Sequence, residues 1–281
     1  MTERLADISA RIDGIRELGA VVNAMKGIAA ARAHAARAQV GAVDSYAATI
    51  ATAMSRVLGP EITEPAKSHE SDSGMGLLVF CAEQGFAGAF SERVLDSISE
   101  TLDPETFFLI GTRGLSIATA RGLKPHWTAP LSSHTHSIPK LADQITTAIY
   151  QAVADERMNR LDVIFTGWET GRPALVRRPL FPIDFAELPQ ATAERPLIQL
   201  PKDALVASMG QEYFNAQVCK AALHAFAAEN EARMEAMSSA GTQIARELET
   251  FQATLRRVRQ EAITAEIIEL GTGAATARDR R

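Results

Sequence analysis

The chain has few cysteines, few aromatic residues and no long apolar run. Cys81 and Cys219 are far apart and in no metal-ligand spacing, which predicts two free, buried thiols in a reducing compartment. Aromatic residues make up 6% of the chain, as expected for closely packed, alanine-rich helices. No apolar run approaches the ~20 residues needed to cross a bilayer, and the first residues, MTERLADIS, lack the apolar core of a signal peptide. We therefore expect a soluble protein that faces the cytosol.

Charge and motifs exclude several classes of site. A net charge of −5 argues against nucleic acid as the main partner. The turn Gly85-Phe-Ala-Gly88 is the only candidate nucleotide site, but it matches neither GxGxxG nor a Walker loop, and its glycines more simply serve backbone geometry. His134 and His136 have no neighbouring carboxylate or cysteine to complete a metal site, so a solvated loop is the better interpretation. We predict no catalytic residue, no cofactor and no metal.

What the chain does have is a proline-free stretch from Asp203 to Leu270, rich in good helix formers. A heptad seam of apolar side chains runs along it, made by Ile244, Leu248, Phe251, Leu255, Val258 and Ala262. Such a helix would be roughly 100 Å long at 1.5 Å per residue. It therefore needs a second helix to cover its seam, and we expect a partner protein around it.

Residues 3 to 58 predict that second helix. One apolar stripe follows 3- and 4-residue steps through Leu5, Ile8, Ile12, Ile15, Leu18, Val22 and Met25. Alanine and glycine dominate the rest, which suits close approach of two helices. Gly59-Pro60 ends the pattern, because proline cannot continue a helix interior.

The middle of the chain predicts a small open α/β sheet. Short apolar runs indicate buried strands at 76–81, 107–110 and 161–166. Helices are predicted at 89–102, 112–121 and 138–158, and a hairpin or strand pair is predicted at 168–181. Residues 60–73 and 124–137 are interpreted as loops. The sequence thus predicts a helix and linker over 1–70, an α/β head over 71–202 and a helix over 203–281. Because the chain leaves along one long helix and returns along the other, the two should be antiparallel.

Two classes of function fit this organisation. One is a mechanical or scaffold subunit whose helices are held by partners. The other is an α/β enzyme with a coiled-coil oligomerisation module. The absence of a catalytic constellation favours the first class.

Several motifs resemble the γ subunit of F-type ATP synthase over essentially the full chain. The N-terminal Asp7-Ile8…Arg11-Ile12 and Asn23-Ala-Met-Lys-Gly27 resemble the start of that family's first helix. Gly76 to Gly88 takes the place of its strand and glycine-rich turn, and Phe108 to Gly114 resembles its "IG.KG" step. The most specific matches are Ala228-Glu-Asn-Glu-Ala-Arg-Met and Arg259-Gln-Glu-Ala-Ile-Thr-Ala-Glu-Ile267.

The resemblance implies a bent antiparallel coiled coil inside an α₃β₃ hexamer, with a Rossmann-like head beside the ε subunit and the c-ring. The chain would be a non-catalytic rotor shaft, peripheral to the membrane on the cytoplasmic face of a bacterial inner membrane. It would couple flow of H⁺ or Na⁺ to ATP synthesis or hydrolysis at the β subunits. An asymmetric shaft can do so by stabilising different β conformations differently.

The resemblance also assigns residues. Arg259, Gln260 and Thr264 match positions that hydrogen-bond a β-subunit loop, and Met25 and Lys26 match a shaft position near an acidic β-subunit loop. The last apolar residues, Ile263, Ile267, Ile268 and Leu270, would turn inside an apolar bearing.

The chain departs from the family pattern in its glycine-rich turn. The family's Arg-Gly-Leu-Cys-Gly-Gly is Gln84-Gly-Phe-Ala-Gly-Ala89 here, and the following Asn is Ser91. A divergent paralogue from an alternate ATPase operon fits this difference. The two cysteines predict no dithiol switch of the chloroplast type.

Overall fold

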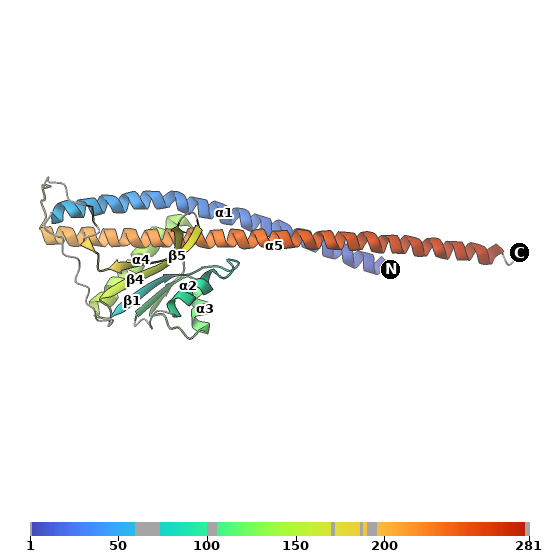
Figure 1. Ribbon diagram of the computed structural model, residues 1–281, viewed down its shortest axis with the longest axis horizontal. Helices are drawn as coiled ribbons and strands as arrows, with labels where there is room; N and C mark the ends of the chain where they lie inside the picture. The colour runs from blue at the N-terminus through green and yellow to red at the C-terminus, as the bar shows by residue number, and fades with distance from the viewer. Residues whose placement is uncertain are drawn as a thin grey trace. The chain divides into compact units, whose positions relative to one another are not determined.

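The computed structural model describes residues 2–59, 74–99, 106–169, 172–185, 188–189 and 196–278. Long helices α1 (Thr2–Leu58) and α5 (Lys202–Arg278) begin and end the order of elements, with a small α/β sheet between them in sequence (Figure 1). The chain divides into two compact units, one of residues 29–233 and one of residues 1–28 with 234–281. The predicted combination of two long helices and an α/β sheet is confirmed, and the predicted loop at 60–73 lies outside the described residues.

The ends of the long helices follow from local chemistry. Gly59 has φ +80°, and its N–H donates to the carbonyl of Ser55 at 2.9 Å, which ends α1 at a residue that tolerates the left-handed region. Helix α5 begins directly after Pro201, whose carbonyl accepts the N–H of Leu205 at 3.1 Å. Asp203 in the first turn complements the positive end of the helix dipole.

The sheet has five strands in the order β3-β2-β1-β4-β5. Strands β1 (Met75–Phe80), β2 (Thr106–Ile110), β3 (Trp127–Ala129) and β4 (Arg160–Glu169) are parallel, and β5 (Arg172–Phe181) pairs antiparallel with β4. The prediction of a hairpin within 168–181 is corrected: residues 172–181 form one strand, and its partner is the strand predicted at 161–166. Strand β3 corrects the prediction of an irregular loop over 124–137. A segment of three residues is too short to show the alternation typical of a strand. Residues 127–129 form a strand because they pair with the edge of β2.

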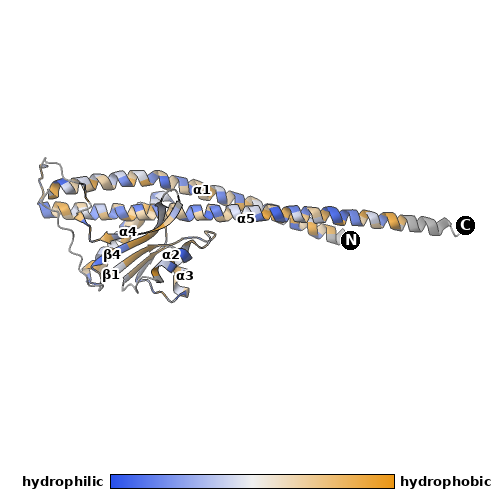
Figure 2. Cartoon of the chain, viewed as in Figure 1, coloured by the Kyte–Doolittle hydropathy of each residue, from blue (hydrophilic) through white to orange (hydrophobic). Residues whose placement is uncertain are grey.

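Helices cover both faces of the sheet. Alternate residues of β1 point to opposite sides, as in any strand: Leu78 and Phe80 enter one core, and Leu77 and Val79 enter the other. The first core also contains residues of α4 (Ile138–Ala154), α5 and Ala36 of α1, whereas the second contains residues of α2 (Phe90–Ser99) and α3 (Thr112–Ala120). A short 3-10 helix, η1 (Thr135–Ser137), precedes α4. The strands are accordingly mostly hydrophobic in Figure 2, while the long helices mix both characters.

Within each unit, α1 and α5 run antiparallel, as predicted. In each unit, residues later in α5 contact residues earlier in α1. The pairs in the unit of residues 29–233 are Tyr46–Glu212, Asp44–Lys220 and Arg37–Glu231. Those in the other unit are Lys26–Ser238 and Gly19–Ile244. The predicted stripe is wrong at Leu18, which is 53% exposed. Its neighbour Gly19 faces α5 instead, because a Cβ there would lie 3.3 Å from Ile244. No helix in the described part of the chain is long and apolar enough to span a membrane.

Candidate functional site

The three polar residues predicted to bind a partner lie exposed near the C-terminal end of α5. Arg259, Gln260 and Thr264 are all exposed. The Thr264 hydroxyl donates to the Gln260 carbonyl at 2.9 Å, within the helix, and no ion pair is formed by Arg259 with any described residue. The guanidinium of Arg259 is thus available to an external carboxylate, for which its planar set of donors is well suited.

The apolar residues of the predicted bearing share that end of α5. Ile263, Ile267 and Leu270 follow steps of 4 and 3, so they form one stripe, and their exposed fractions are 52%, 63% and 68%. Ile268, one position further round the helix, is 60% exposed. Val258, in contrast, is 1% exposed. Exposed apolar side chains that share one helix face are typical of an interaction surface.

Met25 and Lys26 lie on α1, apart from the predicted partner-binding residues of α5. Both are half-buried, and the Lys26 ammonium donates to the Ser238 hydroxyl at 3.2 Å. Ser238 precedes Arg259 by 21 residues on the continuous helix α5, which corresponds to about 30 Å. The structure therefore does not bring the two predicted groups of partner-binding residues together.

A buried polar cluster that the sequence analysis did not predict lies between α5 and the turn after β1. The carboxylate of Glu229 accepts the N–H groups of Glu83 and Gln84 at 3.0 and 3.2 Å. Arg233 pairs with Glu229 and donates to the carbonyls of Gly85 and Gln84 at 3.2 and 3.4 Å. Glu229 and Arg233 are only 3% and 5% exposed. In the sequence they belong to a family motif and have an i,i+4 spacing, but ordinary surface pairs share that spacing, and neither signal indicates burial.

A second carboxylate, that of Glu83, occupies the end of the sheet where open α/β folds usually bind ligands. It accepts the N–H and hydroxyl of Thr112, the first residue of α3, at 3.0 and 2.8 Å, and the N–H of Leu131 at 2.8 Å. The first N–H of α3, that of Thr112, which could otherwise be offered to a phosphate, is therefore engaged by the protein's own side chain. This geometry does not favour a nucleotide site at the Gly85–Gly88 turn.

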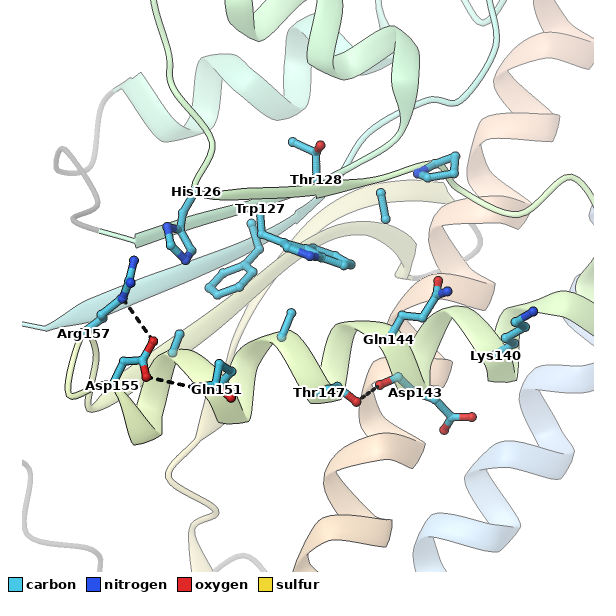
Figure 3. A pocket seen from close by; sticks show the side chains of 15 residues that line it. His126, Trp127, Thr128, Lys140, Asp143, Gln144, Thr147, Gln151, Asp155 and Arg157 are labelled. Atoms are coloured by element: carbon cyan, nitrogen blue, oxygen red, sulfur yellow. Dashed lines mark hydrogen bonds and ion pairs between the residues drawn. The ribbon is translucent and has the colours of Figure 1, made fainter.

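A groove with a volume of about 1000 Å³ lies between the edge strand β3 and helix α4. Figure 3 shows His126 and Trp127 on one side and Gln144, Thr147 and Gln151 of α4 on the other. Its ionic groups are partly paired, since Asp155 accepts from Gln151 at 2.9 Å and lies 3.5 Å from Arg157. The groove contains no nucleophile hydrogen-bonded to a base, and no cluster of His, Cys, Asp and Glu suited to a metal occurs among the described residues.

Both cysteines are buried and free, as predicted. Burial raises the pKa of Cys81 to about 12 and that of Cys219 to about 11, because a thiolate would lose its hydration inside the protein. Neither thiol is a reactive nucleophile near neutral pH.

Comparison with known proteins gives a match over nearly the whole chain. A family model described as ATP synthase matches residues 4–276. The chain belongs to the ATP synthase family. Its curated relatives include the ATP synthase gamma chain of Moorella thermoacetica, 26% identical over 96% of this chain and 98% of that one, and that of Chlorobium luteolum, 27% identical over 96% and 97%.

Solved structures show the same fold. A chain of the Euglena gracilis mitochondrial ATP synthase rotor has a TM-score of 0.64 at 13% identity, covering 94% of this chain and all of that one. A chain of the OSCP/F1/c-ring structure of the same synthase has a TM-score of 0.68 at 14% identity, covering 100% and 97%. The resemblance to gamma chains is thus confirmed, and this member of the family is a non-catalytic gamma subunit of the complex.

Proposed function

We propose that the chain is the central rotor shaft of the F1 sector, coupling ion flow, of H⁺ or Na⁺, to ATP synthesis or hydrolysis at the β subunits. The observation that carries this proposal is the C-terminal part of α5. It presents a free arginine and an exposed apolar stripe that no described residue covers. A helix end of this composition needs a protein sleeve, and the α₃β₃ hexamer is the sleeve that gamma chains occupy.

In this proposal the long helices act as an antiparallel coiled coil, with residues 1–70 and 203–281 forming the shaft and 71–202 a Rossmann-like head. Support for close helix packing comes from the small residues of α1, such as Ala29, Ala33 and Ala36, which are at most 4% exposed. Support for a Rossmann-like head comes from its parallel strands with helices on both faces.

Arg259, Gln260 and Thr264 contact a loop of the β subunit in this arrangement, and Ile263, Ile267, Ile268 and Leu270 turn in an apolar bearing. Met25 and Lys26 form a second β-subunit contact, about 30 Å away along the shaft. The two contacts are distinct, so substitutions at one should be additive with substitutions at the other.

The head contacts the ε subunit and the c-ring. The similar solved chains belong to a rotor and to an OSCP/F1/c-ring assembly, which supports partners of this kind. As part of F1, the chain is peripheral to the membrane, and we place it on the cytoplasmic face of a bacterial inner membrane.

The proposal is tested by co-expression with α and β subunits, followed by purification and reconstitution with the membrane sector. We expect a stable complex whose ATP synthesis falls several-fold in Arg259→Ala/Gln260→Ala. Arg246→Ala/Gln243→Ala is the matched control, because these residues are exposed on the same helix. Failure to form a complex contradicts the shaft assignment, and synthesis equal to that of the control contradicts the assignment of Arg259 and Gln260.

A further inference from the structure

The cluster of Glu229, Asn230 and Arg233 is an unusual way to attach a turn to a helix. Burying an ion pair costs hydration that its attraction often fails to recover, and apolar side chains of similar volume usually stabilise a fold as well or better. Here the two charged side chains form hydrogen bonds with backbone groups of the turn as well as with each other. Such an arrangement fixes geometry more than it adds stability.

Almost every polar group of the cluster has a partner. Arg233 donates through Nε to Gly85, through one terminal nitrogen to Asn230 at 3.1 Å, and through the other to Gln84 and Glu229. Asn230 in turn donates to the Phe226 carbonyl at 2.8 Å. The orientation of the guanidinium is therefore set by α5, and the guanidinium sets the position of the turn.

The other side of the turn is also attached to α5. Ala82, Ala87 and Phe90 form a small buried cluster with Ala228, the residue before Glu229. The N–H of Ala82 donates to the Ser91 hydroxyl at 3.0 Å, which closes the base of the turn. Residues 83–88 are thus held on both sides, and we call this segment the β1 turn.

The β1 turn presents one aromatic side chain in a strained conformation. Phe86 has φ +63°, a region that aromatic residues rarely adopt, and it is 68% exposed. A conformation of this kind is unfavourable for a residue with a side chain, and it persists only when the surroundings impose it. The residues that impose it are those of the buried cluster, because their hydrogen bonds end at Gly85, next to Phe86.

We propose that Glu229 and Arg233 are positioning residues for rotary coupling. They hold the β1 turn, with Phe86 at its tip, as a rigid projection of α5, so that the turn and the long helix move as one body. This role rests on the proposed function of the chain as a shaft. It also fits the altered turn sequence: Glu229 and Arg233 bind only backbone groups of Glu83, Gln84 and Gly85, so this part of the attachment does not depend on which side chains stand at these positions.

The first test measures hydrogen exchange of the full chain. Glu229→Gln and Arg233→Lys should each lower the protection of the Glu83 and Gln84 amides at least tenfold, while amides within β1 and β2 keep theirs. Glu247→Gln, an exposed glutamate of α5, is the matched control and should change nothing. Unchanged protection in both variants overturns the proposal. Arg233→Lys keeps its charge and the Glu229 carboxylate, so it serves if Glu229→Gln does not fold.

A charge-swapped variant separates positioning from simple ion pairing. Glu229→Arg/Arg233→Glu retains opposite charges at i,i+4, but it turns donors toward the N–H groups of the turn. We expect it not to restore protection. Restored protection would mean that the pair only stabilises α5, and the positioning role would be wrong.

The second test measures coupling in the reconstituted complex as ions pumped per ATP hydrolysed. Glu229→Gln and Arg233→Lys should lower this ratio at least threefold while hydrolysis continues, and Glu247→Gln should match the unsubstituted chain. Lost amide protection with an unchanged ratio overturns the coupling role. Failure of the unsubstituted chain to assemble contradicts the proposed function itself, and the exchange data remain a separate measurement of the attachment.

Discussion

The contact between Gly114 and Cys81 gives a stability prediction that can be worked out from distances. Gly114 lies buried in the first turn of α3, against the residue that follows strand β1. A Cβ added at Gly114 would lie 2.1 Å from the Cβ and 2.8 Å from the Sγ of Cys81. Normal contact between carbon atoms is about 3.5–4.0 Å, so Gly114→Ala requires the two elements to separate by more than 1 Å.

The backbone resists that separation. The N–H of Gly114 donates to the Ala82 carbonyl at 3.2 Å, and the N–H of Cys81 donates to the Ile110 carbonyl at 2.8 Å. Overpacking of a core costs about 1–3 kcal/mol, and the anchored backbone favours the upper end of that range. Alanine returns about 1 kcal/mol through its better helix propensity. We therefore expect Gly114→Ala to lower the free energy of unfolding by about 2 kcal/mol.

Equilibrium urea unfolding of the full chain, followed by circular dichroism, measures this difference. Gly14→Ala is the control: it is a helical glycine with no atom within 4 Å of the added Cβ, and it should stabilise the protein by about 0.5–1 kcal/mol. Cys81→Ala should not rescue Gly114→Ala, because the Cβ of residue 81 remains. A Gly114→Ala variant as stable as the unsubstituted chain would refute the reasoning.

Two further predictions concern the carboxyl end of the sheet and the thiols. Glu83→Ala leaves the N–H groups of Thr112 and Leu131 without their acceptor and should destabilise the chain by about 2–3 kcal/mol in urea unfolding, whereas Glu247→Ala should change stability little. For Cys81, a pKa raised from 9.0 to about 12 means that the folded state holds its proton where the unfolded state loses it. The thiol contribution to stability is thus fully present below about pH 9 and is lost as pH rises toward 12. Alkylation of Cys81 at pH 8, followed by mass spectrometry, should be about a thousandfold slower in the native than in the urea-unfolded chain, since the pKa values differ by about 3; equal rates would show that the site is open.

Most of the fold was predictable because its elements carry strong local patterns. Helices α1 and α5 lack internal proline and are rich in helix formers, and β1, β2 and β4 are short apolar runs between turn residues. Strand β3 was missed because pairing with β2, and no pattern of its own, makes Trp127–Ala129 a strand. Leu18 was misplaced because steps of 3 and 4 residues fit Leu18 and Gly19 equally well. The structure places Gly19 against α5, where the missing side chain allows the two helices to approach closely.

The exposed sites were predictable only through family resemblance. Arg259 and Gln260 look like any polar pair on a helix, and their exposure agrees with a partner contact without identifying the partner. The buried cluster shows the opposite case. Glu229 and Arg233 were visible as part of a family motif, but nothing in the sequence indicated that they bind the backbone of a turn roughly 145 residues earlier.

By itself, the sequence determined the two long helices, the open sheet, the absence of a recognisable catalytic motif and the family. These are local or pattern properties, set by propensity, periodicity and residue spacing. Only the tertiary structure decided which charges are buried and what they hold. Glu83 and Glu229 accept hydrogen bonds from backbone N–H groups that are distant from them in sequence. Folding brings these otherwise unpaired N–H groups next to the two carboxylates. Burial and hydrogen bonding are properties of neighbours in space, and the spacing of residues along the chain does not record them.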